Sequence, residues 1–153
     1  MTQEIRFASF EELVEGRLRG NQLMLSGIGI SPEEARWLWE SPRLLEVSWL
    51  DLEDNKLGDE GVRDLAQSEN AANLQMLSLT RNGISDAGLK FLAESKHLNK
   101  LKRLHLKENN IAGEGVIALF QSPALENLSI FHINDGWSCR KRDGWRYRSR
   151  DVK

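Results

Sequence analysis

The stretch VSWLDLEDNKL, residues 47–57, decides the fold because its pattern recurs twice at one interval. Residues 74–84 read LQMLSLTRNGI and residues 101–111 read LKRLHLKENNI, so each copy starts 27 residues after the previous one. Leucine, valine or isoleucine stands at positions 1, 4, 6 and 11 of every copy, and asparagine stands at position 9. A fixed period of this size indicates stacked repeat units.

The second half of each unit keeps the same register. Glycine recurs at 61, 88 and 115, leucine at 65, 92 and 119, and serine at 41, 68, 95 and 122. The flanks retain the apolar positions but lose other residues of the pattern. Ile28 and Gly136 replace the asparagine, and Glu34 replaces the glycine. Full units between decayed ends are typical of a solenoid with capping coils.

The pattern L-x-x-L-x-L-x-x-N-x-I/L with this period resembles the leucine-rich repeats, and GDEGVRDLA at 58–66 resembles their helical, ribonuclease-inhibitor-like subclass. The resemblance covers residues 20–136. It implies an α/β fold, a right-handed solenoid of about four to five coils with a short parallel sheet on the concave side and helices on the convex side. We expect a single domain, 1–153, made of an N-terminal cap (1–19), repeats (20–136) and a basic aromatic C-terminal cap or tail (137–153).

Each unit predicts a short strand followed by a helix. Leu50 and Leu52 alternate with polar neighbours, as in a strand with one buried face. The asparagine after each strand is expected to pair with backbone groups where the chain turns. SPEE at 31–34 reads as a helix N-cap, and Asp59 and Asp86 place acids in the first helical turn. The recurring glycine predicts a close approach of helix to strand.

Both ends of the array should be covered by apolar caps. At the N-terminus, residues 10–18 predict a short amphipathic helix, and the lid draws on Ile5, Phe7, Phe10, Leu13 and Val14. At the C-terminus, the lid would draw on Trp137, Trp145 and Tyr147.

The outward-pointing strand residues form the candidate binding surface, because they line up as ladders across successive units. The first ladder is Gln22, Trp49, Met76, Arg103, Ile130. The second is Met24, Asp51, Ser78, His105, His132. The third is Ser26, Glu53, Thr80, Lys107, Asn134, and the fourth is Gly27, Asp54, Arg81, Glu108, Asp135. We predict that a partner is bound on the concave face by Trp49, Asp51, Glu53, Met76, Ser78, Arg103, His105, Lys107 and His132.

This face is predicted to be acidic toward one end and basic toward the other, with Trp49 and Met76 between. Exposed Trp, Arg and Met are enriched at protein interfaces. In the competing interpretation, Trp49 packs across Met76 and the charges only solvate the sheet. The resemblance implies a non-enzymatic protein-interaction module. It also allows a small-GTPase regulator of the Ran-GTPase-activating type, although no functional residue of that type matches a position here.

No catalytic residue, metal site or cofactor is expected. His105 and His132 are predicted to lie about 5 Å apart on their ladder, but together with Cys139 they lack the sequence spacing of a metal site. Asp51, Ser78 and His105 share a ladder. Asp51 and His105 are nevertheless two strands apart, about 10 Å, which is too far for a hydrogen bond. The sequence contains no glycine-rich phosphate loop and no dinucleotide fingerprint.

The last 17 residues, 137–153, differ in composition from the rest. They carry seven Lys or Arg against two Asp, a net charge of +5, whereas the other 136 residues sum to −7. Trp145 and Tyr147 lie between the basic residues. This segment is therefore an alternative site for nucleic acid, through phosphate contacts and base stacking. A capping strand or a solvated tail is the competing interpretation.

Composition sets the remaining expectations. The formal net charge is −2 and 40% of residues are hydrophobic, which suits one soluble domain. Cys139 is the only cysteine, so no internal disulfide can form and a reducing, cytoplasmic location is expected. No apolar run reaches the roughly 18 residues of a membrane span, and no secretory leader is expected. We expect a monomer whose partner is another protein.

Overall fold

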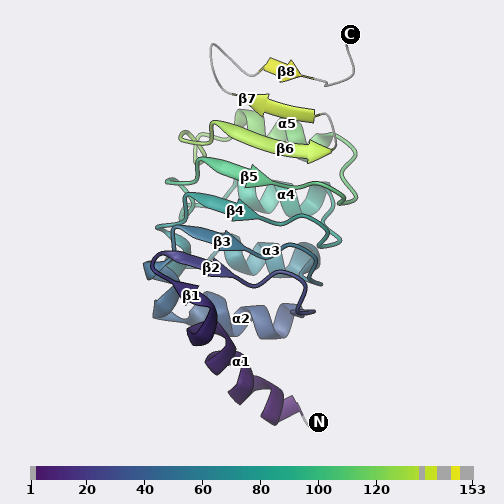
Figure 1. Ribbon diagram of the computed structural model, residues 1–153. Coiled ribbons are helices and arrows are strands. Elements are labelled where there is room, and N and C mark those ends of the chain that lie inside the picture. The colour runs from purple at the N-terminus through teal and green to yellow at the C-terminus, as the bar shows by residue number, and fades with distance from the viewer. Residues whose placement is uncertain (1–2, 135–136, 141–145, 149–153) are drawn as a thin grey trace.

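The computed structural model describes the backbone of residues 3–134, 137–140 and 146–148, and the side-chain surroundings of residues 10–133. The described elements form two layers (Figure 1), a sheet and a row of helices that pack on one side of it. The strands lie side by side in chain order from β1 to β8. The chain therefore advances along the sheet by one strand in each repeat.

Parallel strands form the centre of the sheet, and each carries a buried apolar residue. These strands are β2 (Gln22–Met24), β3 (Trp49–Asp51), β4 (Met76–Ser78), β5 (Arg103–His105) and β6 (Ile130–Asn134). Their register aligns five side chains that are each at most 1% exposed: Leu23, Leu50, Leu77, Leu104 and Phe131. The prediction that the repeat leucines stack on one another is confirmed. Burying each such side chain stabilises the fold by roughly 1.5–3 kcal/mol.

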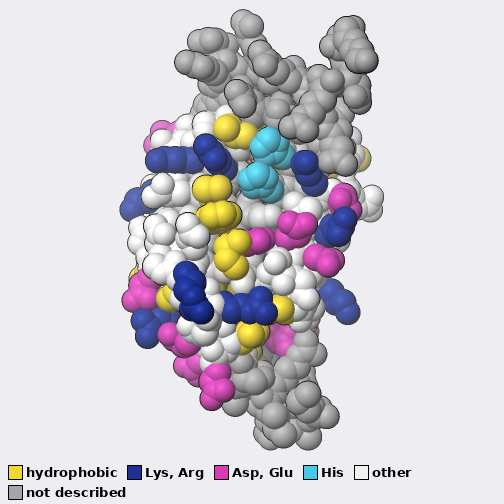
Figure 2. All heavy atoms as spheres, viewed as in Figure 1, with side chains coloured by type: hydrophobic (Ala, Val, Ile, Leu, Met, Phe, Trp, Pro, Cys, Tyr) yellow, Lys and Arg dark blue, Asp and Glu magenta, His cyan; other side chains and the backbone are white. Residues whose placement is uncertain are grey.

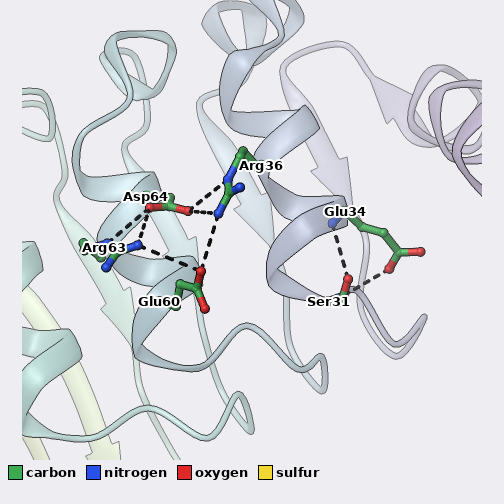
Figure 3. Close-up of polar contacts among 6 residues, drawn as sticks. All are labelled: Ser31, Glu34, Arg36, Glu60, Arg63 and Asp64. Atoms are coloured by element: carbon green, nitrogen blue, oxygen red, sulfur yellow. Dashed lines mark hydrogen bonds and ion pairs between the residues drawn. The ribbon is translucent and has the colours of Figure 1, made fainter.

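A helix returns the chain in each repeat. The helices are α2 (Pro32–Glu40), α3 (Gly58–Ala66), α4 (Asp86–Ala93) and α5 (Glu114–Gln121), and short 3-10 helices follow at η1 (Pro42–Glu46) and η2 (Glu69–Ala71). The predicted cap at the start of α2 is confirmed. The Ser31 Oγ accepts from the Glu34 N–H at 3.3 Å and the Glu34 carboxylate accepts from the Ser31 N–H at 3.0 Å (Figure 3). This reciprocal pairing satisfies two N–H groups that a helix start leaves unpaired.

Antiparallel strands extend the sheet at both ends. The sequence did not predict the N-terminal one, whereas a capping strand within 137–153 was the competing interpretation for that segment. At the N-terminal end, α1 (Gln3–Arg17) leads into β1 (Leu18–Arg19), which pairs with β2. The predicted helix thus starts earlier than residue 10, and Leu18 belongs to a strand. Phe10 and Val14 are buried in the core, and the Phe10 ring meets Trp37 edge-on at 5.7 Å. At the other end, β7 (Trp137–Arg140) and β8 (Arg146–Arg148) follow β6.

The repeated asparagines join each turn to the previous repeat, as predicted. The Asn55 amide donates to the Leu25 and Leu52 carbonyls, both at 2.9 Å, and its oxygen accepts from the Ile30 N–H at 2.9 Å. Asn82 and Asn109 make the equivalent bonds one and two repeats later. Each amide therefore satisfies backbone groups from two repeats at once.

A second polar ladder lies at the opposite ends of the helices. The Ser68 hydroxyl donates to the Trp39 carbonyl at 2.6 Å, and the Ser95 hydroxyl donates to the Ala66 carbonyl at 2.6 Å. Ser122 bonds the Ala93 carbonyl in the same way. Three of the serines that mark the unit ends thus cap the helix of the previous repeat, because each donates to a carbonyl in the last turn of that repeat's helix.

Gly88 and Gly115 lie against the preceding helix and Gly61 against Leu57 of its own repeat, so the predicted helix-to-strand approach is wrong. A Cβ added at Gly115 would lie 2.7 Å from the Leu89 Cβ and 2.9 Å from the Asp86 backbone, all on the preceding helix. The Asp86 carboxylate accepts from the Gly115 N–H at 2.9 Å. Asp59 makes the same bond to the Gly88 N–H at 3.1 Å. These acids therefore cap the next repeat's helix, and the small residue lets the carboxylate reach the amide.

Candidate partner-binding face

The sheet face turned away from the helices carries all the predicted contact residues, and we call it the open face. The first two ladders are confirmed by the strand register, which pairs Trp49 with Met76, Met76 with Arg103 and Asp51 with Ser78. Arg103 is exposed, and the other predicted contact residues are half-buried. They are Trp49, Asp51, Glu53, Met76, Ser78, His105, Lys107 and His132.

Thr80 departs from the pattern predicted for the third ladder. It was placed among the outward positions, but it is only 7% exposed. The third ladder is therefore not a continuous row of accessible side chains, because Thr80 interrupts it between Glu53 and Lys107.

Charge divides the open face into two parts. We call Asp51, Glu53 and Asp54 the acidic end, and Arg103, His105, Lys107 and His132 the basic end. Figure 2 shows a column of hydrophobic side chains on this face, with acidic side chains beside it and two histidines beside its upper part. The Asp51 carboxylate accepts from the Glu53 N–H at 3.0 Å, so part of the acidic end is held by its own backbone.

The two histidines of the basic end are stacked. The ring centroids of His105 and His132 lie 4.8 Å apart with 22° between the ring planes, as their ladder positions predict. Half-burial lowers the pKa of His105, Lys107 and Arg103 lower it further, and Asp51 and Glu53 oppose the change. His105 is thus held toward its neutral form in the unbound protein.

The turns beside the open face share an unusual backbone conformation. Asp54, Arg81 and Glu108 have φ values of 55°, 52° and 54°, and Gly27 has 68° at the equivalent position. Residues other than glycine seldom adopt such values. The sequence therefore did not predict this conformation at three charged residues. Arg81 and Glu108 also form an ion pair, Nη2 to Oε1 at 3.2 Å, and Glu108 raises the pKa of Arg81.

The helix side carries its own polar features. Arg36 of α2 contacts Glu60 at 3.5 Å and Asp64 at 3.3 Å on α3, and Arg63 contacts the same two carboxylates (Figure 3). A shallow pocket of about 260 Å³ opens between the ends of α3 and α4, where Phe91 and His97 belong to its lining. The ladders of outward-pointing strand residues did not predict this pocket, because its lining belongs to the helix side.

Within residues 10–133, no cluster of three or more His, Cys, Asp or Glu side chains is placed to hold a metal ion. Cys139, Trp137 and Tyr147 lie in strands whose side chains are outside the described residues, and Trp145 is outside them entirely. The described part of the chain contains no helix that is long and apolar enough to span a membrane.

The repeat geometry agrees with a comparison to known families. The family model described as Leucine Rich repeat matches residues 50–66, 70–93 and 97–120. The chain is a leucine-rich-repeat protein. The matched segments are consecutive and coincide with the repeats that carry the asparagine ladder. A search of the curated proteins finds no match to this leucine-rich-repeat protein.

Proposed function

We propose that this protein is a non-enzymatic interaction module that binds another protein on the open face of its sheet. The observation that carries the proposal is the first ladder, where Trp49 and Met76 lie side by side and partly exposed, Trp49 on the strand of Asp51 and Met76 on the strand between the acidic and basic ends. Large apolar side chains rimmed by charge are typical of interface cores.

Two further points support this proposal. Leucine-rich repeats commonly mediate protein–protein interaction, and the stacked strands of solenoids provide extended concave surfaces for binding. On the open face, the chemistry changes from one repeat to the next while the buried positions remain apolar. The fold does not require a tryptophan at 49 or an arginine at 103, so a binding role accounts for them better than packing does.

We also make finer proposals about the architecture of the repeats. We infer that the repeats belong to the helical, ribonuclease-inhibitor-like subclass, because α3, α4 and α5 each follow a strand and have eight or nine residues. We further propose a right-handed array of about four to five coils in one domain, present as a monomer. A cytoplasmic location remains a prediction from Cys139, and regulation of a small GTPase remains an alternative that a GTP-hydrolysis assay addresses.

The experiment compares proteins captured from an extract of the source cells by the immobilised chain and by two open-face variants. Trp49→Ala removes the apolar anchor, and Arg103→Ala removes an exposed cation with little packing. Ile117→Ala is the matched control, because Ile117 is an apolar residue that is 54% exposed on α5, on the other side of the molecule. Thermal melting of every variant checks that it remains folded.

The proposal requires a defined protein whose capture falls at least tenfold with Trp49→Ala and Arg103→Ala and stays unchanged with Ile117→Ala. If the captured set is the same for all four chains, the open face is not the binding surface. If capture is lost only with Ile117→Ala, the helix side binds instead.

A further inference from the structure

We propose that the basic end of the open face binds a short acidic segment of the partner protein, and that the stacked histidine pair takes up a proton when this segment binds. This inference rests on the proposed function, because it names the chemistry that the open face would recognise and the condition that controls it.

The first support is the gathering of donor groups on two adjacent strands. Arg103 and His105 lie two residues apart on β5, and Lys107 continues the same alternation just beyond the strand, so all three face outward. His132 stacks on His105 from β6. A carboxylate can accept two parallel hydrogen bonds from a guanidinium and further bonds from an ammonium or a protonated imidazole. The basic end is thus suited to carboxylates.

The second support is the boundary of the basic end on the side of β4. On the next strand, β4, Met76 and Ser78 carry no charge, and the strand after it carries Asp51. Neighbouring strands are about 4.8 Å apart, so the acidic end begins about 10 Å from His105. A long polyanion such as a nucleic acid strand that crossed the face would meet these carboxylates. A few acidic side chains of a protein fit the basic end without reaching them.

The third support is the charge around the histidine pair. Arg103 on β5 and Lys107 just beyond it oppose protonation of His105, while Asp51 on β3 and Glu53 just beyond it favour protonation. From the remaining neighbours, β4 presents the neutral Ser78, and β7 places Ser138 in register with His132 and Arg140 in register with Ile130. Two imidazolium rings with centroids 4.8 Å apart would also repel each other.

An acidic segment bound at this end would reverse that balance, because its carboxylates favour the protonated form of the rings. By linkage, binding then raises the pKa of the histidine pair, and affinity rises as the pH falls through that region. Glutamate side chains of the ligand stay ionised above about pH 5. The window for the effect is therefore about pH 7.5 to 5.5. A shift of one pKa unit at one ring corresponds to about a tenfold change in affinity.

The test uses fluorescein-labelled hexaglutamate and the full chain without a histidine tag, titrated by fluorescence anisotropy at pH 7.5, 6.5 and 5.5 at constant ionic strength. We expect about tenfold tighter binding at pH 5.5 than at pH 7.5. In parallel, a titration of the histidine ring protons by NMR should show that saturating hexaglutamate raises the pKa of His105.

Variants assign the effect to named groups. The double variant His105→Asn with His132→Asn should lose the increase in affinity between pH 7.5 and pH 5.5. Arg103→Gln should weaken binding at every pH. His97→Asn is the matched control, because His97 is a half-buried histidine beside the helix-side pocket, and its removal should change neither property.

Three outcomes overturn the inference: binding that does not change with pH, a pH effect that survives in the double variant, or a hexanucleotide of thymidine that binds at least as tightly as hexaglutamate. These outcomes are separate from the capture experiment. If hexaglutamate fails to bind while Trp49→Ala still abolishes capture, the proposed function stands and this inference falls. If the peptide binds with the expected pH effect while capture is unaffected, the proposed function fails.

Discussion

Replacing Asn55 by alanine tests how the repeats hold together. The Asn55 side chain bonds the Leu25 carbonyl and the Ile30 N–H, and these two backbone groups have no other hydrogen-bond partner among the described residues. The Leu52 carbonyl keeps a bond from Asn82 at 2.8 Å. Asn55→Ala thus leaves two buried groups unpaired. Each costs about 1–3 kcal/mol, so the free energy of unfolding should fall by about 2–6 kcal/mol.

Urea denaturation followed by circular dichroism measures this loss. Asn73→Ala is the matched control, because Asn73 also donates across repeats, to the Leu45 carbonyl at 2.9 Å, but at an exposed site. Its removal should cost less than about 1 kcal/mol, since water can replace the lost bond. The urea slope of each variant checks that unfolding stays cooperative, as repeat arrays can lose cooperativity. Equal losses in the two variants would refute the reasoning.

Three further predictions concern packing and capping. Gly115→Ala should lower stability by about 1–3 kcal/mol because its Cβ would meet Leu89 and Asp86 at 2.7–2.9 Å, whereas Gly61→Ala, with its closest contact at 3.0 Å, should cost less; chemical denaturation of both variants decides this. Leu77→Ala should cost about 2–5 kcal/mol, measured in the same way, because Leu77 is 0% exposed between Leu50 and Leu104. Asp86→Asn should reduce the loss of stability below about pH 4, measured by thermal melting from pH 7 to pH 3. Burial would raise the pKa of Asp86, but the backbone N–H groups of Gly115, Gly113 and Ala112 lower it overall, so its ionised form stabilises the fold above the unfolded pKa of 3.8 and this contribution disappears as the pH falls.

The repeat period predicted the architecture because it is set by contacts between equivalent residues. Leu50, Leu77 and Leu104 can only shield one another if their strands are adjacent, so one spacing fixes the sheet order and the outward ladders together. The asparagine bonds followed from the same argument, since a buried amide after a strand must pair with turn backbone.

Other features lacked a local signal. Leu18 and Arg19 form a strand of only two residues, which is too short for an alternating pattern to be recognised. The left-handed conformation at Arg81 and Glu108 is imposed by the turn and not by side chains that favour it. Asp59 looked like an ordinary acid in the first turn of its own helix, but its bonds go to Ser85 and Gly88, 26 and 29 residues away.

The candidate face consists of positions whose residue type is not fixed by packing between the repeats. At the buried ladder each repeat presents an apolar residue, because any other choice would leave a cavity or an unpaired polar group against its neighbours. One residue further along each strand, the second ladder carries methionine, aspartate, serine and two histidines, and the stacking of strands does not require an apolar residue there. Two ladders on the same short strands thus differ in what constrains them. A charge gradient and a stacked histidine pair at positions that packing leaves free are therefore where a function of this chain is best sought.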